Sequence, residues 1–346
     1  MISVPTSIAL ICPAQRQRAA PACPVAPLRH ALHLLLALLA AAALAACSAG
    51  PAAVLPAVGS INPPGPAALV SRAEKAGMPA RLLAAADIGQ CGNNLQPADS
   101  VRATAALLDD RPGLVIAAGD LAYPDGRASD FAECYDPAWG SVRSRTLPAP
   151  GNHEYHHANA DGYFSYFGAQ AGERGAGWYS VNFRGWHLVA LNSNLPANEG
   201  SAQLAWLRRD LASRPPGCLL AFWHHPRFSS GGHGNNRNMD LAWQVLASAG
   251  ADVVLNGHDH DYERFAPLDA QGLAADKGIR EFVVGSGGAQ LTPFLLVKDH
   301  SEVRDDHTYG ILEIELHRDA YDWRFLGIDG AEFEDRGSAQ CHQAAP

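Results

Sequence analysis

Charged residues are scarce in this chain, and basic ones are scarcer than acidic ones. Only 18% of the 346 residues are charged, and 26 Lys and Arg stand against 35 Asp and Glu, for a formal net charge of -9. An acidic protein repels nucleic acid and anionic membranes, so we expect no nucleic-acid partner. A small phosphate ester is not excluded, because the charge of bound metal ions can outweigh a diffuse negative field.

Internal repeats, long blocks of one charge and closely spaced cysteines are also absent. Downstream of Cys47 the chain has four cysteines, none close to another in sequence, which disfavours a structural zinc site. In an oxidising compartment an even number favours disulfides, with three possible pairings. We predict Cys91–Cys134 and Cys218–Cys341, because Cys91 and Cys134 each closely follow a motif described below. Buried free thiols are the alternative.

The N-terminal region resembles an export signal. The apolar run Leu34–Ala46 follows three arginines, is too short for a membrane span and has the length of a signal-peptide core. It ends in a sequence that resembles a bacterial lipobox, so we expect residues 1–47 to be a signal peptide, with Cys47 lipid-anchored at the cell envelope. The alternative is an ordinary secretory signal and a soluble periplasmic or secreted protein. Residues 48–79, rich in Ala, Pro and Gly, are predicted to be a tether.

Residues 80–340 are predicted to form one domain, in which strands alternate with helices and a strand-rich part follows. Leu114–Ala118 is continuously apolar, as expected of a strand buried on both faces. This order predicts the α/β class, as a mixed β-sandwich flanked by helices. The predicted strands are Arg81–Ala86, Leu114–Ala118, Thr146–Pro148, Trp178–Phe183, Trp186–Asn192, Leu219–Trp223, Val253–Leu255, Glu281–Val284, Gly310–Leu316 and Tyr321–Leu326. The predicted helices are Ala98–Leu108, Ala202–Ala212 and Met239–Ser248.

Five short motifs carry side chains of metal-binding type. They are Asp87-Ile88-Gly89, Gly119-Asp120-Leu121-Ala122-Tyr123, Gly151-Asn152-His153-Glu154, Phe222-Trp223-His224-His225-Pro226 and Gly257-His258-Asp259-His260. Each lies at the end of a predicted strand, where α/β sheets bind ligands, so we expect all five at one rim. Their two carboxylates, phenol, amide oxygen and three imidazoles suit two neighbouring metal ions and indicate metal-assisted phosphoester hydrolysis.

Residue chemistry suggests separate roles for these side chains. Asp120, on a tight turn, is the candidate carboxylate that bridges the two metal ions. Tyr123 can reach the same ion as Asp87 through a phenolate, a strong donor to ferric iron, although a tyrosine packed under a loop is the alternative. His258 and His260 alternate, so both can point to one side of an extended segment and bind adjacent metal ions.

The remaining motif residues fit either a metal or the substrate. Asn152 offers an amide oxygen, although such residues are usually part of turns. Of His224 and His225, one can bind metal while the other packs or forms a hydrogen bond behind it. His153 has no ligand vacancy to fill and is better placed to bind a phosphate oxygen or donate a proton.

With these motifs in this order over about residues 80–330, the chain resembles the calcineurin-like metallophosphoesterases, most closely their purple acid phosphatase branch. The resemblance implies a dinuclear site at the rim of an αββα sandwich. It implies ferric iron held by Asp87, Asp120, Tyr123 and His260. It implies a divalent zinc, iron or manganese ion held by Asp120, Asn152, His224 and His258. It also implies substrate contacts by His153 and by His233, whose alternative is a flexible glycine-rich loop.

Three positions differ from family patterns. Gly89 stands where most calcineurin-like enzymes have histidine, and this loss combined with the gain of Tyr123 is typical of the purple branch. Ala86 and Ala221 replace a usual glycine and a usual valine, and neither change removes a ligand.

The resemblance implies an exported, acid phosphatase-like hydrolase in which metal-bound hydroxide attacks phosphorus in line. His153 and His233 would assist the leaving alkoxide, and a small phosphomonoester is the favoured substrate. A phosphodiesterase of the same fold and a non-catalytic metal- or phosphate-binding lipoprotein are the alternatives. A metallo-β-lactamase-type hydrolase is disfavoured, because the fifth motif lacks that family's last histidine and spacing. We expect membrane contact only through the lipid anchor, and the sequence does not set the oligomeric state.

Overall fold

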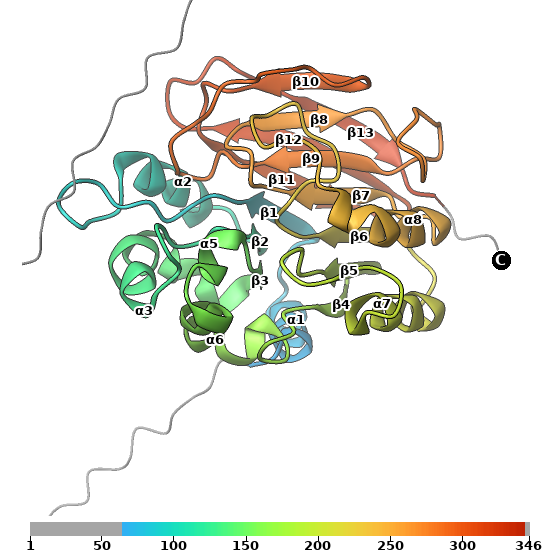
Figure 1. Cartoon of the computed structure of the whole chain (residues 1–346), viewed down its shortest axis with the longest axis horizontal. Helices are drawn as coiled ribbons and strands as arrows, with labels where there is room; N and C mark the ends of the chain where they lie inside the picture. Colours follow the sequence, from blue (N-terminus) through green and yellow to red (C-terminus); the bar gives the residue numbers. More distant parts are fainter. Residues whose placement is uncertain (1–63, 343–346) are drawn as a thin grey trace, which may run out of the picture. The chain divides into compact units, whose positions relative to one another are not determined.

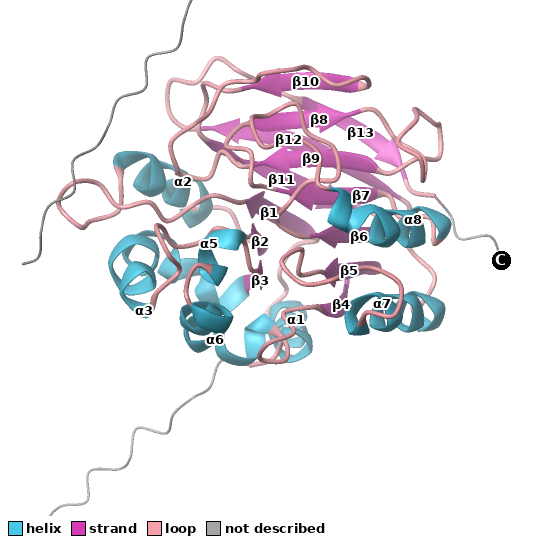
Figure 2. Cartoon of the chain, viewed as in Figure 1, coloured by secondary structure: helices cyan, strands magenta, loops and turns pink. Residues whose placement is uncertain are grey.

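Two mixed β-sheets stack face to face, with helices on their outer faces, in the computed structural model, which describes residues 64–342 (Figures 1 and 2). The predicted signal peptide, the lipobox at Cys47 and residues 48–63 of the predicted tether lie outside the described residues. The four-layer arrangement confirms the predicted class, a mixed β-sandwich flanked by helices.

The first sheet has the strand order β13-β12-β11-β1-β2-β3. Its strands are β1 (Arg81–Ala85), β2 (Leu114–Ala118), β3 (Thr146–Ala149), β11 (Gly310–Leu316), β12 (Ala320–Gly327) and β13 (Arg336–Gln340). The pairs β1–β2 and β2–β3 are parallel, so the carboxyl ends of these three strands reach the same rim.

The second sheet has the strand order β10-β8-β9-β7-β6-β5-β4. Its strands are β4 (Tyr179–Phe183), β5 (Trp186–Ala190), β6 (Leu219–Phe222), β7 (Val253–Asn256), β8 (Tyr262–Phe265), β9 (Arg280–Val284) and β10 (Ser301–Asp305). Here β5, β6, β7 and β9 run parallel, so a second set of carboxyl ends is aligned.

Helices flank the two sheets of the sandwich. They are α1 (Pro66–Lys75), α2 (Asp99–Asp109), α3 (Ala128–Asp130), α4 (Asp136–Trp139), α5 (Asn152–Tyr155), α6 (Asp161–Phe167), α7 (Ala202–Ser213) and α8 (Asp240–Ser248). Side chains alternate across β1: Leu82 and Ala84 join the core between the sheets, whereas Leu83 and Ala85 pack in the cluster under α2. A third apolar cluster lies between the second sheet and α7 and α8.

The structure corrects the predicted elements at several points. Helix α1 lies inside the predicted tether and buries Leu69, Val70 and Ala73 in the core, so the folded domain begins before residue 80. The prediction also missed α3–α6, β8, β10 and β13. Strand β8 has no apolar pattern, because its Glu263 and Arg264 are buried and held by polar partners.

Both predicted disulfides are present. Cys91 is bonded to Cys134 at 2.03 Å and Cys218 to Cys341 at 1.98 Å. The first joins the loop after β1 to the short helix η1 (Phe131–Tyr135), beside the motif loops. Disulfides are typical of proteins in oxidising, extracytoplasmic compartments. Among residues 64–342, no helix combines the length and apolar composition needed to cross a membrane.

Candidate metal centre

All five motifs meet at one rim of the sandwich. The candidate ligands that follow a strand within three residues are Asp87, Asp120, Asn152, His224 and His258. Backbone hydrogen bonds join their loops: the Asp87 N–H donates to the Gly119 carbonyl at 3.0 Å, and the Gly257 N–H donates to the His224 carbonyl at 2.9 Å. The His258 N–H, after β7, donates to Oδ2 of Asp87, after β1, at 2.8 Å, so strand ends from both sheets build one shared site.

Three of the candidate ligands have a left-handed backbone. The φ angles are 58° at Asp87, 51° at Asp120 and 74° at His258. This region is sterically unfavourable for residues with a Cβ, and strain of this kind is concentrated at functional sites.

Glycines in the motifs allow the ligand side chains to approach the backbone. A Cβ at Gly119 would lie 2.6 Å from Cβ of His224, and one at Gly151 would lie 2.1 Å from Oδ1 of Asp120. At Gly89 a Cβ would lie 2.3 Å from the Leu121 carbonyl oxygen. There is thus no room at position 89 for the histidine that most calcineurin-like enzymes carry.

The Tyr123 hydroxyl lies among three other candidate ligands. Its oxygen is 3.0 Å from Oδ1 of Asp87, 3.4 Å from Oδ2 of Asp120 and 3.0 Å from Nε2 of His260. His260 Nε2 is also 3.4 Å from Oδ1 of Asp87. These four side chains form one group of potential ligand atoms.

A second group shares Asp120 with the first. Nε2 of His224 lies 3.2 Å from Oδ2 of Asp120 and 3.1 Å from Oδ1 of Asn152. The His258 ring centre is 5.1 Å from that of His224. Asp120 is therefore the one carboxylate between the two groups, as a bridging ligand requires.

The histidine tautomers test whether these groups fit metal ions. Nδ1 of His224 faces the Ala118 carbonyl at 3.1 Å, and Nδ1 of His260 faces the Gln290 carbonyl at 2.8 Å. A carbonyl only accepts, so each Nδ1 carries a proton, and Nε2 is the ring atom that can bind either a second proton or a metal ion. The oxygen atoms around these Nε2 atoms favour a cation there, so the residues fit a two-metal site.

The electrostatics of the site point to the same need for positive charge. Burial alone would lower the pKa of His224 and of His260, but the Asp120 carboxylate raises the first to about 9 and Asp87 raises the second to about 9. Burial would raise the pKa of Asp120, yet the charges of His224 and His153 hold it well below its usual range. Burial and the neighbouring His224 lower the pKa of His258 strongly, so its ring is neutral and able to bind a metal.

His153 and His233 lie at the mouth of the site. The His153 N–H donates to Oδ1 of Asp120 at 2.8 Å, and its ring packs 4.3 Å from that of Tyr123. The His233 ring lies 4.2 Å from that of His258 and its side chain is 52% exposed. Both imidazoles are therefore available to a bound substrate.

Two acidic residues that the sequence analysis left without a role position this site. The buried Glu154 carboxylate accepts the N–H groups of Gly151 at 2.7 Å and Leu121 at 2.8 Å, which clamps the second motif loop to the third. Asp259 accepts the backbone N–H of His233 at 2.8 Å and lies 3.0 Å from its Nδ1. Their places inside two of the motifs were the only available signal.

His225 lies inside the site rather than behind it. A potential ligand atom of its ring lies within 4.8 Å of those of His224 and His258. Its Nδ1 is 2.8 Å from the Ser193 hydroxyl. Burial and the charge of His224 lower the pKa of His225 to about 3, so this imidazole is neutral.

The fold and the site together define a metallophosphoesterase. The chain belongs to the calcineurin-like phosphoesterase family, whose sequence profile matches residues 80–262. Purple acid phosphatase 15 of Arabidopsis thaliana is 28% identical over 223 residues, which are 54% of this chain and 41% of that protein. A nucleotide pyrophosphatase/phosphodiesterase of Hordeum vulgare is 24% identical over 263 residues, 64% of this chain and 70% of that protein.

The solved structure of purple acid phosphatase PPD1 from yellow lupin has a similar fold. It superposes with a TM-score of 0.63 at 21% identity, over 75% of this chain and 53% of that one. The resemblance to purple acid phosphatases is confirmed, and membership of the family implies a dinuclear metal site. The chain spans less than half the length of the Arabidopsis relative.

Proposed function

We propose that this chain is an exported phosphomonoesterase that works with two metal ions. The ligands of a ferric ion would be Asp87, Asp120, Tyr123 and His260. The ligands of a divalent zinc, iron or manganese ion would be Asp120, Asn152, His224 and His258. The main support is the convergence of the Tyr123 hydroxyl, two carboxylates and the Nε2 atoms of His224 and His260, which lie 3.0–3.4 Å from one another's ligand atoms.

The proposed mechanism divides the work between metals and protein. Bound metal ions would supply an activated water and neutralise charge that develops on the phosphoryl oxygens. The side chains at the mouth act on the leaving group: His153 and His233 are within the same rim and can donate a proton to the departing oxygen. Asp259, bonded to His233, keeps that ring in one orientation.

The similar proteins include enzymes named for two ester classes. We favour monoesters, since the family relatives include a protein named as an acid phosphatase. A phosphodiesterase is the second candidate, supported by the similarity to the barley protein named as a pyrophosphatase and phosphodiesterase.

Metal analysis combined with turnover tests the proposal. The purified protein should hold two metal ions per chain, one of them iron, and should hydrolyse p-nitrophenyl phosphate faster than bis(p-nitrophenyl) phosphate. The reverse preference would favour the diesterase. Retention of metal without hydrolysis of either ester would refute catalysis and leave a metal-binding protein.

We further propose that Cys47 carries a lipid anchor and is the only membrane contact. Mass spectrometry of the membrane fraction should find a mature chain that begins at a modified Cys47. An unmodified chain that starts nearby would instead identify a soluble periplasmic or secreted protein.

A further inference from the structure

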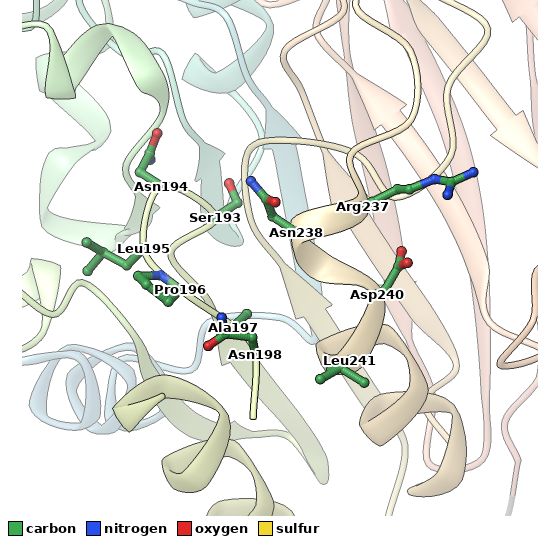
Figure 3. Close-up of a pocket in the computed structure, with 10 residues that line it drawn as sticks. All are labelled: Ser193, Asn194, Leu195, Pro196, Ala197, Asn198, Arg237, Asn238, Asp240 and Leu241. Carbon is green, nitrogen blue, oxygen red and sulfur yellow. The ribbon is translucent and has the colours of Figure 1, made fainter. Parts of the chain in front are cut away.

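A separate hollow opens between the loop after β5 and the segment that begins α8 (Figure 3). Its volume is about 370 Å³, within the range of about 300–1,000 Å³ typical of small-molecule sites. It is lined by Ser193, Asn194, Leu195, Pro196, Ala197 and Asn198 on one side, and by Arg237, Asn238, Asp240 and Leu241 on the other.

Hydrogen bonds connect this hollow to the metal centre. The Ser193 hydroxyl lies 2.8 Å from Nδ1 of His225, whose ring centre is 4.3 Å from that of His258. The Asn194 amide donates to the Pro150 carbonyl at 3.1 Å, two residues before Asn152. The hollow therefore lies directly beside His225 and the third motif loop, at the edge of the metal centre.

The lining presents hydrogen-bonding groups together with two charged side chains, Arg237 and Asp240. Asp240 is neutralised by Arg227, whose Nε lies 2.5 Å from its carboxylate, and the Arg237 guanidinium points away from the opposite loop (Figure 3). The Asn238 amide points toward Ser193 (Figure 3) and makes no hydrogen bond to another side chain within residues 64–342. Its donor and acceptor atoms are thus available to a ligand.

Apolar side chains complete the wall. Leu195, Pro196 and Leu241 lie beside the amides and the hydroxyl. A mixed surface of this kind matches a ligand group that has both C–H faces and hydroxyls. A hydroxyl that enters the hollow loses its hydrogen bonds to water, and the polar side chains of the wall can replace them. Because Asp240 is already paired with Arg227, the hollow offers a ligand mainly amides, a hydroxyl and apolar groups.

We propose that this hollow binds the leaving group of the phosphoester, and that this group is a neutral alcohol with several hydroxyls, such as a sugar. The inference rests on the proposed function, because it assigns one end of the substrate of that same site. Asn238 is then a specificity-determining residue that forms hydrogen bonds to hydroxyls of the departing alcohol.

Two esters with the same kind of leaving oxygen test the inference. Glucose 6-phosphate and n-hexyl phosphate both release a primary alcohol, so they differ in hydroxyls and not in leaving-group basicity. Asn238→Leu should lower kcat/KM for glucose 6-phosphate about tenfold relative to that for n-hexyl phosphate, the size expected for one lost hydrogen bond. Gln244→Leu makes the same kind of change on α8, outside the hollow, and should leave the ratio unaltered.

Each outcome decides between the two proposals. A wild-type preference for glucose 6-phosphate that Asn238→Leu removes supports the subsite. Equal kcat/KM for the two esters in the wild type, or a ratio that Asn238→Leu does not change, overturns the subsite and leaves the hydrolase intact. Metal-loaded wild type that hydrolyses neither of these esters nor p-nitrophenyl phosphate overturns both.

Discussion

The site has two parts that are held in different ways. We call the seven candidate ligands the metal floor. We call the side chains above them the loop rim, which consists of His153, His156, His233 and Asn238. On the floor the side chains of Asp87 and His224 are 0% exposed, whereas on the rim those of His156 and His233 are 48% and 52% exposed. Side chains of the metal floor contact backbone atoms from both sheets, so few residue types fit at these positions. The chemistry is therefore fixed by packing, while the rim is free to set specificity.

The largest effect should follow a change at the centre of the floor. Asp120→Asn keeps the shape of the side chain but removes the charge of the proposed bridging ligand. We expect turnover of p-nitrophenyl phosphate to fall at least about 10⁴-fold, equal to about 5.5 kcal/mol, with loss of bound metal. Activity assays and metal analysis on the same preparation would measure both.

Asp125→Asn is the matched control for that change. Asp125 lies five residues later, is 29% exposed and pairs with Arg127. It should retain metal and lose less than about threefold in turnover, as expected for a surface charge. Equal losses in the two variants would contradict the assignment of Asp120 to the metal floor.

Removing each disulfide in turn distinguishes an effect on folding stability from an effect on the geometry of the metal floor. Removing either pair, as Cys91→Ser/Cys134→Ser or as Cys218→Ser/Cys341→Ser, should lower the free energy of unfolding by about 2–4 kcal/mol in urea titrations. Only the first pair joins the loop after Asp87 to η1, so only its loss should also weaken metal binding. Equal metal affinity in both variants would show that the floor is held without this bond.

Tyr123→Phe tests the part of the floor that distinguishes the purple branch. A phenolate bound to ferric iron gives visible charge-transfer absorption, which should disappear in this variant. Iron affinity should fall by at least about 100-fold, because loss of a direct ligand exceeds the usual effect of an outer partner. In Tyr155→Phe the lost hydroxyl accepts, among the residues that the structure describes, only from Asn192, so the colour should remain. Iron-loaded wild type without colour would exclude Tyr123 as a ligand.

The sequence predicts the metal floor better than it predicts the parts of the structure around it. Asp87, Asp120 and Asn152 were found from the sequence because each follows an apolar strand, and the structure brings all seven candidate ligands together. The clamp of Glu154 was not predictable, because it acts on backbone N–H groups that no sequence pattern reveals. Strand β8 and helix α1 were missed where buried charges or an Ala/Pro-rich context hide the apolar periodicity.

The smallest effect should come from the rim, where Asp259 holds His233. Asp259→Asn replaces a charged acceptor by a neutral one and weakens its hydrogen bonds to the His233 ring and backbone. If His233 donates a proton to the leaving oxygen, the loss depends on how much that oxygen needs the proton. Turnover of n-hexyl phosphate should fall about tenfold and that of p-nitrophenyl phosphate by less than about threefold.

This dependence on the leaving group distinguishes a role of Asp259 in positioning His233 from a general loss of loop structure. Asp259 also accepts from the Ser229 hydroxyl at 2.5 Å, so Asp259→Asn can loosen the loop as well as the ring. A loosened loop would lower turnover of both esters alike, whereas a misplaced proton donor penalises the poor leaving group. His233→Gln should reproduce the same selective loss without touching Asp259. Uniform losses in both variants would assign this pair to the structure of the rim and leave proton donation to His153 alone.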